Sequence, residues 1–150
     1  MKLAEALIER ADLQKRLEQL GERLFSNALV QEGEEPAEDP AVLLAELESV
    51  SGSLEEIITR INLTNAAAVV NGVTLTALIA KRDCLKQRIN VTRHFLQTAS
   101  QTAMRSRGSE IIVKSTVSVR ELQKTVDALS KELRETDTAI QAANWSADLI

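Results

Sequence analysis

The segment Leu3–Leu24, LAEALIERADLQKRLEQLGERL, decides the fold, because its apolar residues recur at alternating spacings of three and four. Such spacing averages 3.5 residues and holds one stripe of an α-helix against a partner helix. Three further segments repeat the pattern. The positions of the four stripes are Leu3, Ala6, Arg10, Leu13, Leu17, Leu20 and Leu24; Leu43, Leu47, Val50, Leu54, Ile57 and Ile61; Leu78, Arg82, Leu85, Ile89, Thr92, Leu96, Ala99 and Ala103; and Val119, Leu122, Val126, Leu129, Leu133, Thr136 and Ile140. The chain therefore predicts helical packing rather than a catalytic pocket.

The stripes predict one mainly α-helical domain over residues 1–150, made of four long antiparallel helices. Their expected ranges are about 2–28, 40–67, 75–103 and 118–143. Gly33 and both prolines interrupt the pattern between the first two helices, and Asp39 before Pro40 is a helix-start signal. Short connections allow the helices to close as a bundle, or to open as two coiled-coil-like hairpins that bury their stripes against other subunits. The pattern permits both arrangements.

A small β element is expected beside the third helix. Asn71-Gly72 stands between β-branched residues, which is the strongest short-range signal for a two-residue hairpin turn. The segment 110–117 is also rich in Ile and Val and favours extended structure. We expect residues 69–73 to pair with residues 110–117. Thr74 or Thr76 can cap the third helix, and Ser118 with Glu121 forms a capping-box sequence for the fourth.

The composition indicates a core of aliphatic side chains and a reducing compartment. Hydrophobic residues make up 44% of the chain but aromatic residues only 2%. The single cysteine, Cys84, provides no intrachain disulfide and no cysteine cluster for zinc. Helical periodicity begins at the first residues, where a signal peptide would need an apolar core, so we expect a cytoplasmic protein. The charge-free window 61–80 holds Asn71-Gly72 and several amides, and we expect no stable membrane insertion.

Charge is divided unevenly along the chain. Residues 1–60 hold fourteen acids and six bases, a net of −8, whereas residues 81–120 hold nine bases and two acids, a net of +7. The basic segment could recruit an anionic partner, or it could lie beside the acidic helices, within one subunit or across subunits. We favour the second interpretation. The scarcity of aromatic stacking residues argues against a nucleic-acid partner.

No catalytic constellation emerges from the sequence. His94 is the only histidine, with Asn90 and Thr98 one turn away, and no carboxylate or nucleophile shares its helical face. Cys84 is expected to be a small buried hydrophobe. We predict no catalytic residue and no cofactor.

The acidic loop is the weak candidate for a metal site, because hard cations prefer several carboxylate oxygens. Its spacing does not fit an EF-hand, so a solvated loop is favoured and no metal is predicted. The candidate ligands are Glu32, Glu34, Glu35, Glu38 and Asp39.

The end of the second helix is small and uncharged, which allows close backbone approach. We predict a contact between subunits here, ahead of a ligand site. The contact residues are Asn62, Thr64, Asn65, Ala66, Val69 and Val70.

Several short stretches together resemble a small family of uncharacterised bacterial proteins described as septicolysin-like. The stretches are Met1–Leu7, Gln31–Glu34 with Pro36 and Asp39-Pro40, Arg60–Asn62 with Thr64-Asn65, Arg82-Asp83, Ser109–Ile111, and Gln141 with Asn144-Trp145. The resemblance implies a helical, cytoplasmic, self-associating protein without established catalytic residues. The family label also hints at a cytolysin.

Three functions follow as hypotheses. The first is a non-enzymatic helical protein that assembles with copies of itself, as a scaffold or adaptor. The alternative is a membrane-acting, cytolysin-like protein, as the family label suggests. The third is a metal-dependent enzyme that uses the acidic loop.

Overall fold

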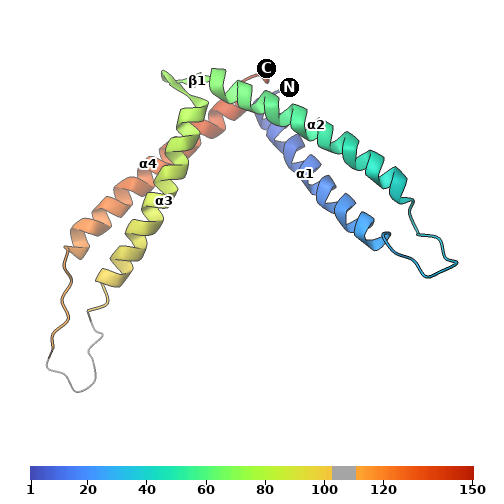
Figure 1. Cartoon of the computed structure of the whole chain (residues 1–150). Helices are drawn as coiled ribbons and strands as arrows, with labels where there is room; N and C mark the ends of the chain where they lie inside the picture. Colours follow the sequence, from blue (N-terminus) through green and yellow to red (C-terminus); the bar gives the residue numbers. More distant parts are fainter. Residues whose placement is uncertain (103–110) are drawn as a thin grey trace. The chain divides into compact units, whose positions relative to one another are not determined.

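The computed structural model describes residues 1–102 and 111–150, and it confirms a mainly α-helical fold with a small β element (Figure 1). The elements in chain order are α1 (Leu3–Ser26), α2 (Pro40–Ala67), β1 (Val69–Val70), β2 (Val73–Thr74), α3 (Leu75–Ala99) and α4 (Val119–Ser146). The prediction for α2 is confirmed at both ends, and α4 runs three residues further than expected. α3 ends at Ala99, and residue 103, its expected end, lies outside the described residues.

The chain forms two compact units. The first unit contains Met1–Val69 together with Ala142–Ile150, and the second contains Val70–Gln141. The prediction of a single domain stays a prediction.

Local capping signals fix where the helices start. The Asp39 carboxylate accepts a hydrogen bond from the backbone N–H of Ala41 at 2.9 Å, and Thr74 Oγ1 accepts one from Ala77 N at 3.2 Å. Ser118 Oγ accepts from Glu121 N at 3.3 Å. These oxygens satisfy N–H groups that have no partner within their own helix.

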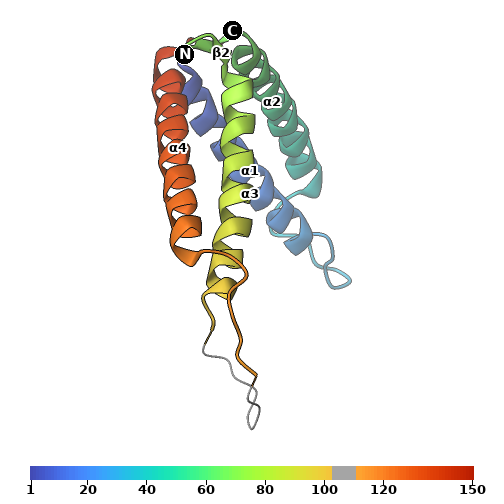
Figure 2. The same cartoon turned by 90° about the vertical axis from the view of Figure 1, so that its left-hand side faces the viewer.

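The β element is a hairpin closed on itself. β1 and β2 pair around Asn71 and Gly72, whose φ angles of 50° and 82° fit a turn with two left-handed residues (Figure 2). The expected pairing with residues 110–117 is wrong for the described part of that segment, because residues 111–117 contain no strand. There the Ser115 hydroxyl bonds Val117 O and Val117 N, a local turn that competes with a ladder. Residue 110 lies outside the described residues.

The first unit is built on the antiparallel α1–α2 hairpin. Leu20, Leu43 and Val50 form its buried cluster, and half-buried leucines pack around them. These leucines are Leu13, Leu17, Leu24 and Leu47. The first two stripes of the sequence therefore face each other, as their spacing predicts.

The C-terminal residues close the first unit by joining α1 to the end of α2. Lys2 and Asp148 form an antiparallel bridge, with Leu3 N donating to Ala147 O at 3.0 Å. Lys2 Nζ lies 2.7 Å from the Asp148 carboxylate, and its hydrogen bond lowers the pKa of that carboxyl. On the other side, Ile150 N donates to Thr64 Oγ1 at 3.0 Å.

The second unit is built on the antiparallel α3–α4 hairpin, whose helices lie side by side in both views (Figures 1 and 2). Leu85, Ile89 and Leu129 form the buried cluster, and Leu133 packs against it. Lys81 pairs with Glu132 at 2.9 Å beside this cluster. Among the described residues, no helix is both long enough and apolar enough to cross a bilayer.

The hydrogen bond from Ile150 N to Thr64 Oγ1, which we call the Thr64 clasp, should contribute measurably to stability. Thr64 is 2% exposed, and Thr64→Val leaves Ile150 N without its acceptor. We expect the free energy of unfolding in urea to fall by about 1–2 kcal/mol. The matched control is Thr59→Val. Each threonine hydroxyl donates to the backbone oxygen four residues earlier, Glu55 O for Thr59 and Arg60 O for Thr64, but Thr59 is exposed and accepts no bond from Ile150 N. Equal losses in the two variants would contradict the role of the clasp.

Two glycines should respond in opposite directions to alanine. Gly72 has a φ of +82°, so Gly72→Ala should lower stability by about 1 kcal/mol. Gly52 lies inside α2 with no atom near its missing Cβ, so Gly52→Ala should raise stability by up to about 1 kcal/mol. Thermal unfolding of both variants checks the prediction, and a stabilised Gly72→Ala would show that the turn is not left-handed.

Candidate functional site

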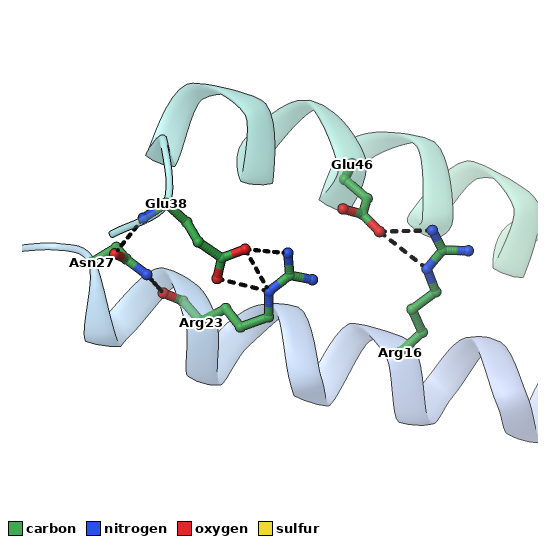
Figure 3. A network of polar contacts seen from close by, with 5 residues as sticks. All are labelled: Arg16, Arg23, Asn27, Glu38 and Glu46. Atoms are coloured by element: carbon green, nitrogen blue, oxygen red, sulfur yellow. Dashed lines mark hydrogen bonds and ion pairs between the residues drawn. The ribbon is translucent and has the colours of Figure 1, made fainter. Parts of the chain in front are cut away.

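Two polar side chains hold the loop end of the α1–α2 hairpin in place. One is Arg23 in the last turn of α1, and the other is Asn27, which caps the end of that helix. We call residues 25–44, from the last turn of α1 to the first turns of α2, the hairpin tip. Arg23 binds the Glu38 carboxylate in two places, through Nε at 3.0 Å and Nη2 at 2.5 Å (Figure 3). Asn27 donates from Nδ2 to Arg23 O at 2.8 Å and accepts from Glu38 N at 2.9 Å. Glu38 is thereby tied to α1 through both its side chain and its backbone.

A second ion pair joins the helices nearer the middle of the hairpin. Arg16 donates from Nη2 and Nε to Glu46 Oε1, at 2.7 and 3.2 Å (Figure 3). Arg16 and Arg23 are two turns apart on α1, so both brace the same side of the hairpin. The acids of α2 and its preceding loop thus neutralise bases of α1.

The Arg23–Glu38 pair changes the acidity of both groups. The hydrogen bonds from Arg23 lower the pKa of Glu38 below its ordinary value, while desolvation opposes this shift. The same hydrogen bonds raise the pKa of Arg23. Both shifts favour the charged pair in the folded chain.

The braced tip presents large apolar side chains to solvent. Phe25 is 82% exposed and Leu29 is 90% exposed. Val30, Val42 and Leu44 are exposed as well. Phe25 follows the stripe residue Leu24, and one residue turns by about 100° on a helix, so it cannot face the seam. The tip therefore combines an ordered polar frame with an uncovered apolar surface.

The acidic loop does not gather its carboxylates. Glu38 is engaged by Arg23 and Asp39 caps α2, while Glu32, Glu34 and Glu35 are exposed. Within residues 1–102 and 111–150, no three side chains of His, Cys, Asp or Glu are grouped so that they could hold a metal ion.

The predicted contact at the end of α2 has mixed exposure. Asn62, Ala66 and Val69 are exposed, and Asn65 and Val70 are half-buried. Thr64, by contrast, is buried and serves the intramolecular bond to Ile150 N. The subunit contact itself stays a prediction.

The expectation that Cys84 is buried is wrong. The thiol is exposed on α3, because Cys84 precedes the seam residue Leu85 by one position and points about 100° away from it. His94 is exposed too.

A basic groove runs between α3 and α4 in the second unit, with a volume of about 360 Å³. We call it the α3–α4 groove. Its lining residues include three bases and no acid, and sequence reasoning located the basic segment but not this juxtaposition. They are Lys86, Ile89, Asn90 and Arg93 from α3, and Ser130, Leu133 and Arg134 from α4.

The fold and these surfaces define a helical protein made of two helical hairpins with charged and apolar outer surfaces. Residues 10–149 match DUF6847, a family of unknown function, and the chain belongs to that family. A crystal structure of a functionally unknown conserved protein from Corynebacterium diphtheriae is similar, with 36% identity, a TM-score of 0.91, and coverage of 100% of this chain and 99% of that one. The comparison with curated proteins gave no match.

The septicolysin-like assignment is wrong. The family match and the similar crystal structure both lead to proteins of unknown function, and neither points to a septicolysin. The stretches that carried the resemblance are short and scattered over four helices and the loops between them, so their order was weak evidence of kinship.

Removing the Glu38 charge should change how stability depends on pH. Because the folded-state pKa of Glu38 is lowered, its carboxylate stabilises the fold above its unfolded-state pKa, and this stability is lost as pH falls through the folded-state pKa. We expect Glu38→Gln to be less stable than the wild type at pH 7, and the difference to vanish in acid. Urea unfolding across pH 2–7 measures it.

The control is Glu34→Gln, in the same loop. Glu34 is exposed and forms no ion pair within the part of the chain that the structure describes. The Glu34→Gln variant should therefore have the same free energy of unfolding as the wild type at every pH. If both variants show the same pH profile, the Arg23–Glu38 pair does not hold the tip.

Proposed function

We propose that the protein is a non-enzymatic helical protein that works by assembling with copies of itself, as a scaffold or adaptor. The observation that carries this proposal is the hairpin tip, where Phe25 and Leu29 are almost fully exposed on a braced frame. Exposed aromatic and aliphatic anchors of this kind are typical of protein–protein contacts.

Energetics support burial of the tip in an assembly. Covering a Phe or Leu side chain contributes roughly 1.5–3 kcal/mol. The Arg23 and Asn27 bonds already order the residues that flank Phe25, so less conformational freedom remains to be lost on association.

The half-buried seam of the first unit supports the same proposal. In a hairpin of two helices, each apolar stripe is covered by one partner helix only. The stripe residues Leu13, Leu17, Leu24 and Leu47 therefore remain partly exposed. Further helices from another copy would complete their burial.

The proposal places the protein in the cytoplasm, with no cofactor and no nucleic-acid partner. Cys84 is a free, exposed thiol, which suits a reducing compartment. Under this proposal, the protein functions through contacts made by its surfaces.

Size-exclusion chromatography with light scattering tests the proposal. We expect the wild type to assemble as its concentration rises, and Phe25→Ser/Leu29→Ser to raise the dissociation constant at least about tenfold while helicity is kept. The control is Val91→Ser, because Val91 is 72% exposed and belongs to α3, not to the tip. A wild type that stays monomeric at high concentration would overturn the proposal.

A further inference from the structure

The bases of the α3–α4 groove stand apart from the other bases of the same hairpin. Lys81 pairs with Glu132, and Arg82 pairs with Asp83 and lies 3.9 Å from Asp137. Lys86, Arg93 and Arg134 form no ion pair with any residue in 1–102 or 111–150. Like charges that share a groove without a carboxylate repel one another, and an acidic partner would relieve that repulsion.

The floor of the groove is apolar. Ile89 and Leu133 line it between the bases, and both belong to the buried cluster of the hairpin or pack against it. The groove therefore suits a partner that brings apolar side chains and acids together.

The hairpin tip has that composition. Residues 27–44 contain five acids and no base. Glu38 and Asp39 are occupied by Arg23 and by the cap of α2, which leaves Glu32, Glu34 and Glu35 exposed beside the apolar residues. The tip thus carries exposed acids together with the exposed apolar side chains of Phe25 and Leu29.

We propose that the hairpin tip of one copy docks in the α3–α4 groove of a second copy. Phe25 and Leu29 lie on the floor of Ile89 and Leu133, and the loop acids face the three groove bases. The inference rests on the proposed function and names the two surfaces that meet. Since exposed charges guide the contact, assembly weakens as salt rises from about 0.02 to 0.5 M.

Charge reversal on the two surfaces tests the docking. One variant carries Arg93→Glu and Arg134→Glu in the groove, and the other carries Glu34→Lys and Glu35→Lys on the tip. We expect each variant alone to assemble at least about tenfold more weakly than the wild type. An equimolar mixture should assemble within about threefold of the wild type, because each altered surface then meets its complement.

Matched controls separate docking from general charge effects. Arg88→Glu changes an exposed base of α3 outside the groove, and Glu55→Lys with Glu56→Lys changes exposed acids of α2 outside the tip. These controls should assemble like the wild type, and circular dichroism should show the same helicity for all variants.

The outcomes distinguish the docking of the tip in the groove from self-assembly in general. If the wild type assembles and the groove and tip variants assemble equally well, the docking is wrong but self-assembly stands. If each variant is weakened and the mixture stays weak, the two surfaces do not meet. A monomeric wild type would overturn both the docking and the proposed function.

Discussion

Each helix is apolar mainly along one stripe, and the partner helix of a two-helix hairpin covers only part of that stripe. In the first unit, Leu20, Leu43 and Val50 occupy the covered seam. In the second, Leu85, Ile89 and Leu129 do the same. Phe25 and Cys84 lie off the stripes and are exposed. The candidate surfaces are therefore consequences of the same geometry that forms the core.

Polar contacts convert these hairpins into defined surfaces. Arg23 and Asn27 tie the backbone and side chain of Glu38 to the end of α1, which orders the loop that leads into α2 at Pro40. At the opposite end of the first unit, Thr64 and Lys2 hold the C-terminal residues. Because these bonds satisfy backbone groups as well as charges, they position the chain more firmly than exposed ion pairs alone.

Charge is balanced inside the hairpins but not across their surfaces. Arg16 and Arg23 meet acids of the α2 side, and Lys81 meets Glu132. What remains is an acidic tip on one hairpin and a basic groove on the other. Under the docking that we propose, these two surfaces of opposite charge would meet between copies of the chain.

The local features could be predicted from the amino-acid sequence. Stripe spacing placed the helices, Asp39 marked one helix start, Thr74 or Thr76 marked another, and Asn71-Gly72 marked the turn. Each of these signals acts within a few residues. Of the candidate site, the acids of the tip were visible in the sequence, but their partners were not. Three features became visible only in the folded chain: Glu38 binds Arg23, Thr64 accepts a hydrogen bond from a residue 86 positions away, and three bases line one groove. These outcomes depend on which helix faces pack together, and the stripe pattern leaves that open because all four stripes have the same spacing.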